Sequence, residues 1–228
     1  MASDNPIISV VIPALNEAET ISQVIQEIEQ YTPYPRSTEI LVVDGGSGDG
    51  TQDFVVNNGA KLIVEPRSGY GRAIRTGIEQ ARGKIVVIVD ADATYETSDL
   101  PKLVDPLLQG NADVSLAARI GGKLLPGSMP KFNYVGNKLF TWFYNRLYKQ
   151  RVSDTQTGFR AITRKALQAI KLIEDDMAIS TEILTQAAKH GLRIFEIPST
   201  YKLRVGKPKL RRFKAGREIL SALLRDIL

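Results

Sequence analysis

The feature that most constrains the fold of this chain is an alternation, through its first half, of short β-branched apolar runs with segments of helical periodicity. The apolar runs are IISVVI (7–12), EILVV (39–43), AKLIV (60–64), KIVVIVD (84–90) and ADVSLAA (112–118). Between the first two, apolar residues recur at i, i+3, i+4 and i+7, namely Ile21, Val24, Ile25 and Ile28. Strands that alternate with helices predict an α/β fold with a parallel sheet.

Polar clusters directly follow three of these runs. They are PALNE from Pro13, DGGSGDGT from Asp44 and DADATYE from Asp90. Ligands of open α/β sheets bind beyond the carboxyl ends of the strands, so we expect these clusters to form one binding site. We also expect Asn16, with Glu19, to cap the first helix.

The glycine-rich cluster does not match a dinucleotide-binding or phosphate-loop motif. DGGSGDGT follows the second strand and has no lysine, and GYGRAI (69–74) lacks the third glycine of the dinucleotide fingerprint. A turn into a helix would leave Asp44 able to accept hydrogen bonds from a ribose or a base. Capping of the next helix by Asp44 and Asp49 is an equally good interpretation.

Asp90 and Asp92 follow the apolar part of the fourth run and favour a metal site. Two carboxylates at i and i+2 leave a strand on the same side, where their charges repel unless a cation or ordered donors compensate them. Mg²⁺ and Mn²⁺ commonly bind through one or two carboxylates and substrate phosphates. A structural aspartate pair is the alternative, but the two neighbouring polar clusters favour binding of a metal and a diphosphate.

Composition narrows the chemistry that the chain can perform. The 228 residues include no cysteine and one histidine, His190, which excludes disulfides, thiolate zinc sites and cysteine nucleophiles. A hydrophobic content of 43% suits one domain. We give His190 a structural role, because His190 and Gly191 have the pattern of a helix end. Residues 197–217 contain eight lysines and arginines and no acid, which favours phosphate, nucleic acid or anionic lipid, although a solvated charged face is the common alternative.

Four stretches resemble successive motifs of family 2 glycosyltransferases with the GT-A fold. They are PALNEAETI, VVDGGSGDGT, GYGRAIRTGIEQARGKIVVIVDADA and DTQTGFRAITRKAL. The last of these, with TEILTQAAKHGLRIFEIPSTYKLRVGKPKL, is similar to the dolichol-phosphate (polyprenyl-phosphate) mannosyltransferase branch and its glucosyltransferase relatives. The resemblance implies a Rossmann-like α/β fold with a mostly parallel central sheet flanked by helices. It also implies a catalytic domain over residues 1–209.

The activity that the resemblance implies is the inverting transfer of a hexose from a nucleotide-sugar to the phosphate of a polyprenyl or dolichyl lipid. Mannose and GDP-mannose are favoured, with Mg²⁺ or Mn²⁺ as cofactor. One alternative is a family 2 enzyme that uses UDP-glucose or another donor, or that extends a saccharide. Another is a non-catalytic nucleotide-binding or nucleic-acid-binding module. The aspartate pair argues against that module, as does a basic segment interleaved with aliphatic rather than aromatic residues, so we expect no nucleic-acid partner.

On the donor side, the family motifs imply a nucleoside pocket, a base or ribose contact at Asp44, and a diphosphate and metal site. The implied nucleoside-pocket residues are Pro13, Ala14 and Glu17, and the implied diphosphate-binding residues are Asp90, Ala91 and Asp92, with Asp90 and Asp92 as metal ligands. Many relatives carry a glutamine metal ligand where this chain has Thr94. Many also read DD where this chain has Asp44 and Gly45.

On the acceptor side, the resemblance implies basic residues around the phosphates and a polar stretch against the sugar. The stretch is 154–158, which begins with Asp154, and Arg119 is the family's basic residue toward the phosphates. The candidates for the acceptor phosphate or a closing loop are Arg204, Lys207 and Lys209. An anionic lipid phosphate needs no strong general base, so cations must instead hold the two phosphates together.

Two segments predict contact with a membrane surface. Residues 137–148 are rich in aromatic and aliphatic side chains and are flanked by basic ones, although a core helix would explain them equally well. Residues 210–228 predict a basic amphipathic helix with an apolar stripe of Leu210, Phe213, Leu220, Leu224 and Ile227. The chain has no run of apolar residues long enough to span a bilayer and no secretory signal pattern. We therefore expect a peripheral protein on the cytoplasmic side of the membrane.

Overall fold

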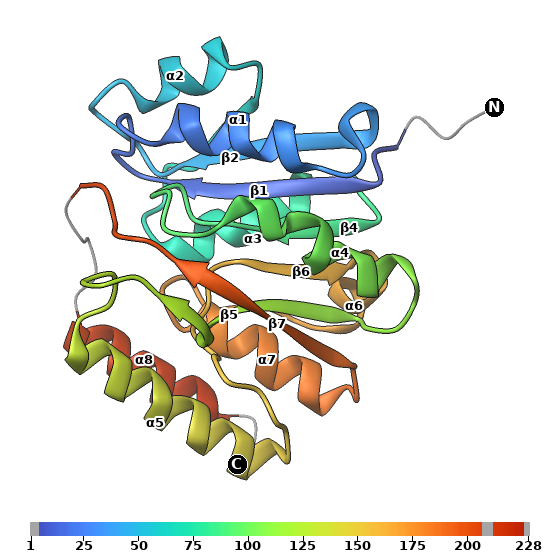
Figure 1. Cartoon of the computed structure of the whole chain (residues 1–228), viewed down its shortest axis with the longest axis vertical. Helices are drawn as coiled ribbons and strands as arrows, with labels where there is room; N and C mark the ends of the chain where they lie inside the picture. The colour runs from blue at the N-terminus through green and yellow to red at the C-terminus, as the bar shows by residue number, and fades with distance from the viewer. Residues whose placement is uncertain (1–4, 207–211, 226–228) are drawn as a thin grey trace.

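The structure, a computed structural model, describes residues 5–206 and 212–225. Its strands form one sheet in the order β3-β2-β1-β4-β6-β5-β7 (Figure 1). Their bounds are β1 Ile8–Ala14, β2 Thr38–Asp44, β3 Lys61–Val64, β4 Ile85–Ile88, β5 Val114–Leu124, β6 Arg160–Thr163 and β7 Ile194–Tyr201. Among the strands of the described residues, β6 alone runs antiparallel to its neighbours. The α/β fold with a mostly parallel sheet is therefore confirmed.

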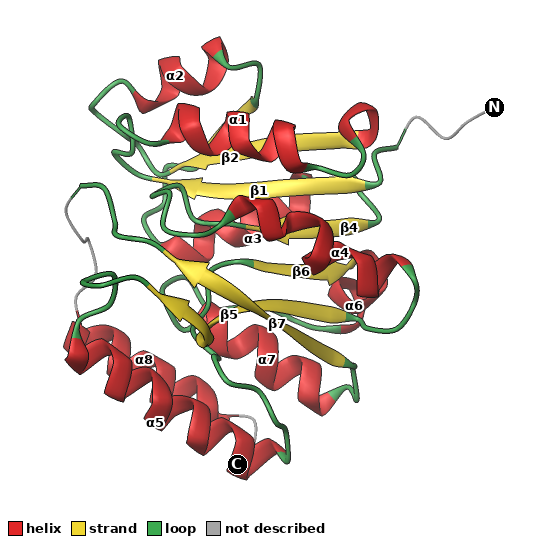
Figure 2. Cartoon of the chain, in the orientation of Figure 1, coloured by secondary structure: helices red, strands yellow, loops and turns green. Residues whose placement is uncertain are grey.

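Helices cover both faces of the sheet (Figure 2). They are α1 Ile21–Tyr31, α2 Thr51–Asn57, α3 Tyr70–Gln80, α4 Leu100–Leu108, α5 Lys131–Tyr148, α6 Arg164–Ala169, α7 Ile179–Lys189 and α8 Arg212–Arg225, with short 3-10 turns η1 Pro35–Ser37 and η2 Thr97–Asp99. Helices α1 and α4 pack on one face, and α3 and α7 pack on the other. Helices α5 and α8 lie side by side against α7, at the opposite end of the molecule from α2.

Strand β1 contributes to the hydrophobic cores on both faces of the sheet, because successive residues point to opposite faces. Val10 and Ile12 belong to the core under α1, whereas Val11 packs with α3. Helix α3 approaches this strand closely: a Cβ on Gly77 would lie 2.2 Å from a Val11 methyl carbon. The predicted helix face of Ile21, Val24, Ile25 and Ile28 is fully buried.

Local structure departs from the sequence-based expectation at two points. The α1 N-cap residue is Thr20, which has no side-chain cap hydrogen bond, so the predicted cap by Asn16 is wrong. The strand β6 was not predicted, because its sequence RAIT contains no continuous apolar run. The predicted helix end is confirmed, since His190 is the C-cap of α7 and Gly191 has a φ of 64°.

The C-terminal helix α8 contributes to the core. Ala215, Ile219, Ala222 and Leu223 are buried, and Ile219 and Leu223 belong to the same cluster as residues of α5 and α7. Of the predicted apolar stripe, Leu220 and Leu224 are exposed. Leu210 and Ile227 lie outside the described residues, as does the side chain of Phe213. The domain boundary at residue 210 stays a prediction.

Candidate active site

The three polar clusters meet at the carboxyl edge of the sheet. Strands β1 and β2 end together, with Ala14 paired to Asp44, and β4 lies on the other side of β1. Strand β6 runs in the opposite direction, so its start faces this edge, and the 154–158 stretch reaches the site from that side. A Cβ on Gly158 would lie 2.2 Å from the Asp90 carboxylate, which shows how closely this stretch approaches.

Hydrogen bonds join the loop after β1 to the loop after β2. The Asn16 amide N–H donates to Ser47 Oγ at 2.7 Å, and Asn16 Oδ1 accepts from the Gly48 amide at 2.9 Å. The Glu17 amide donates to Thr51 Oγ1 at 2.9 Å. Asn16 therefore fixes two loops against each other instead of capping a helix.

Asp44 is fully buried at the end of β2, and its own turn occupies its carboxylate. Oδ2 accepts from the amides of Gly46 at 3.0 Å and Ser47 at 2.9 Å, and from Gln52 Nε2 at 2.7 Å, while Ser47 Oγ donates to Oδ1. A base or ribose would have to replace one of these donors. Contact between Asp44 and the nucleoside stays a prediction. The predicted nucleoside contacts of Pro13 and Ala14, which are buried in β1, also stay predictions.

Asp90 and Asp92 lie beyond strand β4, which ends at Ile88, and a turn over residues 91–92 follows Asp90 directly. Asp90 Oδ1 accepts a hydrogen bond from Tyr70 Oη at 2.6 Å. Burial, and then the neighbouring charge of Asp92, raise the pKa of Asp90 to about 6. Electrostatic repulsion between the two carboxylates was expected from the sequence, but the turn, and not strand alternation, brings them together.

Asp92 is 4% exposed and has partners on both carboxylate oxygens. Oδ1 accepts from Thr94 Oγ1 at 2.6 Å and from the Thr94 amide at 3.2 Å. Oδ2 pairs with Arg204 Nη1 at 2.8 Å, and Arg204 Nη2 pairs with Glu17 Oε1 at 2.8 Å. Thr94 therefore positions Asp92, and Arg204 connects the loops after β1 and β4. Ala91, which stands between the two aspartates in the sequence, is buried.

The residues at this edge fit a divalent cation. Asp92 Oδ2 already binds a positively charged group, the Arg204 guanidinium, so this oxygen is placed to take a cation. Within the residues that the structure describes, no cluster of three or more acidic or histidine side chains is arranged to hold a metal. One or two carboxylates together with substrate phosphates are a common set of Mg²⁺ ligands.

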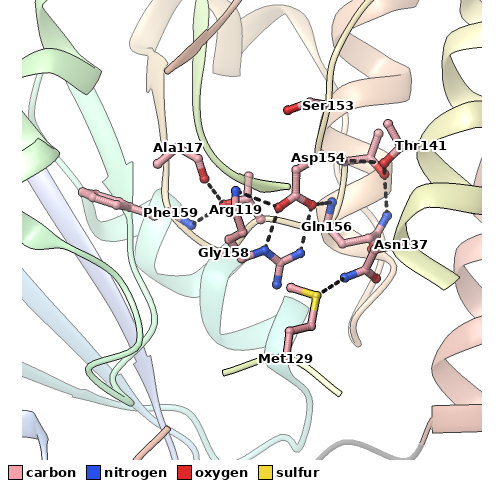
Figure 3. Close-up of polar contacts among 12 residues, drawn as sticks. Ala117, Arg119, Met129, Asn137, Thr141, Ser153, Asp154, Gln156, Gly158 and Phe159 are labelled. Atoms are coloured by element: carbon pink, nitrogen blue, oxygen red, sulfur yellow. Dashed lines mark hydrogen bonds and ion pairs between the residues drawn. The ribbon is translucent and has the colours of Figure 1, made fainter. Parts of the chain in front are cut away.

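Arg119 and Asp154 form a buried bidentate pair (Figure 3). Arg119 Nε lies 2.7 Å from Asp154 Oδ2 and Nη2 lies 2.9 Å from Oδ1, and the Arg119 amide also donates to Oδ2 at 3.1 Å. Burial raises the pKa of Asp154, but the Arg119 charge and hydrogen bonds outweigh burial and hold it below its usual value. The Arg119 guanidinium also lies over the Tyr201 ring, 5.3 Å from its centroid. Roles for this pair in the reaction stay predictions.

Tyr95 is a site residue that the sequence alone did not identify. Its Oη accepts from the Gly158 amide at 2.5 Å, and its ring packs edge-on against Phe159 and Tyr201. It thus holds the 154–158 stretch beside Asp90. The only signal in the sequence was the position of Tyr95 within the DADATYE cluster. That motif does not show whether the tyrosine hydroxyl makes a hydrogen bond in the site or the ring merely packs in the core. Lys207 and Lys209 lie outside the described residues.

The chain belongs to glycosyltransferase family 2, since residues 9–171 match the family described as glycosyl transferase family 2. It is 36% identical to the low-salt glycan biosynthesis hexosyltransferase Agl6 of Haloferax volcanii, over 92% of this chain and 51% of the relative. It is 32% identical to the dolichyl-phosphate hexose transferase of the same organism, over 97% of this chain and 94% of the relative. The chain thus spans about half of the first relative and nearly all of the second.

Among solved structures, the fold is similar to glucosyl-3-phosphoglycerate synthase from Mycobacterium tuberculosis in complex with Mn²⁺, UDP and glucosyl-3-phosphoglycerate. The TM-score is 0.77 at 23% identity, over 97% of this chain and 80% of that one. This likeness establishes the GT-A type of fold that the resemblance implied.

Proposed function

We propose that this protein transfers a hexose from a nucleotide-sugar to the phosphate of a polyprenyl or dolichyl lipid at a membrane surface, with inversion at the anomeric carbon. The family and the name of the Haloferax dolichyl-phosphate hexose transferase support this assignment. The observation that carries the lipid part is the exposed face of α5. Mannose from GDP-mannose is our favoured donor sugar, and UDP-glucose is the second candidate, because a structural neighbour is bound to UDP.

The donor half of the proposal rests on the acidic residues at the carboxyl edge. Glu17, Asp90 and Asp92 come from the loops after β1 and β4, next to the turn that Asp44 organises. Asp90 and Asp92 would hold Mg²⁺ or Mn²⁺, which would act as a Lewis acid on the departing diphosphate. Thr94 would keep Oδ2 of Asp92 directed toward the metal.

The acceptor half needs cations and no strong base. An acceptor phosphate oxygen would form the new bond to the anomeric carbon while the bond from that carbon to the donor diphosphate oxygen breaks, and the electron pair would leave with the diphosphate. The acceptor is already anionic, so no proton has to be removed. Arg204 is our candidate for binding its phosphate, since its guanidinium lies beside Asp92 and its side chain is 30% exposed. Arg119 would contribute indirectly, because it holds Asp154 and with it the 154–158 stretch in place.

The exposed face of α5 has the composition of a membrane-surface element. Every residue of this helix that is classed as exposed is either basic or large and apolar: Lys131, Phe132, Val135, Lys138, Leu139, Trp142, Arg146 and Leu147. Trp142 is 58% exposed and Phe132 is 63% exposed. Helices that lie in a bilayer interface insert apolar side chains into the membrane and carry basic residues beside them. Each basic residue near an anionic membrane surface contributes roughly 1 kcal/mol to binding.

Helix α8 lies beside α5. Leu220 and Leu224 are exposed on it. Part of its charge is neutralised within the protein, because Lys214 pairs with Asp176 and Arg225 pairs with Glu174. No helix in the described part of the chain is long and apolar enough to cross a membrane. The membrane contact would therefore come mainly from α5, and the cytoplasmic side stays a prediction from the sequence.

A transfer assay with matched surface variants tests this proposal. Purified protein is incubated with vesicles that contain anionic lipid and a polyprenyl phosphate, and transfer from labelled GDP-mannose or UDP-glucose is measured with Mg²⁺ and with Mn²⁺. Trp142→Ser should weaken vesicle binding and slow transfer, whereas Phe54→Ser, which changes a 45% exposed aromatic on α2, should change neither. Transfer to a soluble saccharide but not to the lipid would contradict the proposed acceptor.

A further inference from the structure

Arg204 occupies the position of a cation between two carboxylates of the donor site. Its guanidinium contacts Glu17 Oε1 and Asp92 Oδ2, each at 2.8 Å. The two acids come from different loops, after β1 and after β4, and Arg204 follows β7. Three segments that are distant in sequence therefore converge on one positive group.

Arg204 and a metal ion compete for the same oxygen. Asp92 Oδ1 is taken by the Thr94 hydroxyl at 2.6 Å, which leaves Oδ2 as the oxygen that binds a cation. Arg204 Nη1 holds that oxygen at 2.8 Å. Two cations at such a distance from one oxygen repel each other strongly in a partly buried site. A divalent metal on Oδ2 therefore weakens the hold of this oxygen on Arg204.

The Arg204 contact is one that the protein can give up. Arg204 Nε is buried without a hydrogen-bond partner, which is unfavourable for a charged donor. The backbone just before it is anchored, because the Lys202 amide donates to the Thr94 carbonyl at 2.7 Å and Tyr201 forms a β-bridge with Tyr95. Arg204 can thus leave Asp92 without disturbing the turn that holds the aspartates.

We propose that Arg204 is a displaceable counter-ion: it fills the cation position between Glu17 and Asp92 while the site is empty, and a divalent metal with a nucleoside diphosphate displaces it. The displaced guanidinium then becomes available to the second phosphate group, that of the acceptor, which it can bind through two parallel N–H donors. This inference rests on the proposed function, because it assigns a second state to the same site.

The test measures Mn²⁺ binding to the full chain by calorimetry in the absence of nucleotide. Arg204→Gln should bind Mn²⁺ about tenfold more tightly than the parent, because a competing cation is gone. Lys202→Gln is the matched control. It removes the same charge two residues away, where Lys202 Nζ pairs with Glu96 at 3.2 Å and not with the site carboxylates, so its affinity should stay within about twofold of the parent. Arg204→Lys should give an intermediate affinity, because it keeps the charge but not the forked contact.

The outcomes separate this inference from the proposed function. Mn²⁺ binding by Arg204→Gln that is no tighter than binding by Lys202→Gln overturns the inference, while metal-dependent nucleotide binding by the parent leaves the proposed function standing. If the parent binds no Mn²⁺ even with GDP or UDP, the proposed donor site itself is wrong. Melting temperatures of the variants show that each one is folded.

A second measurement tests the release of the guanidinium. Farnesyl phosphate serves as a short isoprenyl phosphate probe, and its affinity is measured with and without Mn²⁺ and nucleoside diphosphate. The parent should bind the probe more tightly when both are present, and Arg204→Gln should lose this gain. An equal gain in both proteins overturns the second role of Arg204.

Discussion

Arg119 and Asp154 satisfy each other inside the protein, through two guanidinium bonds of 2.7 and 2.9 Å and a third bond from the Arg119 amide at 3.1 Å. Asp154 is fully buried and Arg119 is 8% exposed. The pair ties β5 to the start of the 154–158 stretch, which lies against Asp90. These contacts hold the Asp154 carboxylate ionised and in a fixed position. The pair therefore helps to determine the shape of the site.

The first prediction concerns the stability that this pair provides. Asp154→Asn should lower the free energy of unfolding by about 3–5 kcal/mol, because it leaves the Arg119 charge buried and unpaired. Asp113→Asn is the matched control, since Arg193 holds Asp113 with the same three kinds of donor at 2.9–3.1 Å but on the surface, and it should cost about 1 kcal/mol or less. Urea unfolding measures both variants. Equal losses would mean that burial does not govern the Arg119 pair.

The second prediction concerns the metal site. Asp92→Asn should abolish metal-dependent binding of the nucleotide-sugar while the fold survives, because it removes the anionic oxygen at the cation position without a change in shape. Calorimetry with GDP-mannose and UDP-glucose, each with Mg²⁺ or Mn²⁺, measures the loss. Binding as tight as that of the parent would show that the metal lies elsewhere.

The third prediction concerns Thr94, which stands where many relatives have a glutamine. Thr94→Val keeps the shape but removes the hydroxyl that donates to Asp92 Oδ1 at 2.6 Å, so Mn²⁺ binding should weaken by roughly fivefold to tenfold. Thr94→Ser keeps the hydroxyl and should recover most of the affinity. If the serine variant binds Mn²⁺ as weakly as the valine variant, the hydroxyl does not orient Asp92.

The fourth prediction concerns acid stability and Glu65, which follows β3. Hydrogen bonds from Arg67 and then from Thr76 lower the pKa of Glu65 to about 2, from an ordinary value of 4.5. A carboxyl whose folded pKa is depressed stabilises the protein above its unfolded pKa, and this contribution is lost as pH falls from 4.5 toward 2. The melting temperature of the parent should therefore fall more over this range than that of Glu65→Gln. Parallel curves for the two proteins would contradict this role of Glu65.

The sequence by itself determined the elements that depend on local periodicity. The apolar spacing of Ile21, Val24, Ile25 and Ile28 predicted α1 and its buried face, because a helix repeats every 3.6 residues whatever it packs against. The pair His190 and Gly191 marked the end of α7 for the same kind of local reason. The β-branched runs predicted five strands and the polar clusters that follow them, and hence the edge of the sheet at which to look for the site.

Only the tertiary structure decided which side chains meet at that edge. Strand β6 inserts antiparallel between β4 and β5, and this brings the 154–158 stretch to Asp90. Asn16 binds a loop 32 residues further along the chain instead of its own helix. Arg204 reaches Asp92 and Glu17 from the loop after β7, more than 100 residues further along the chain than Asp92. Such contacts join residues far apart in sequence, where no local periodicity records them, and they exist because the sheet order places these chain segments side by side.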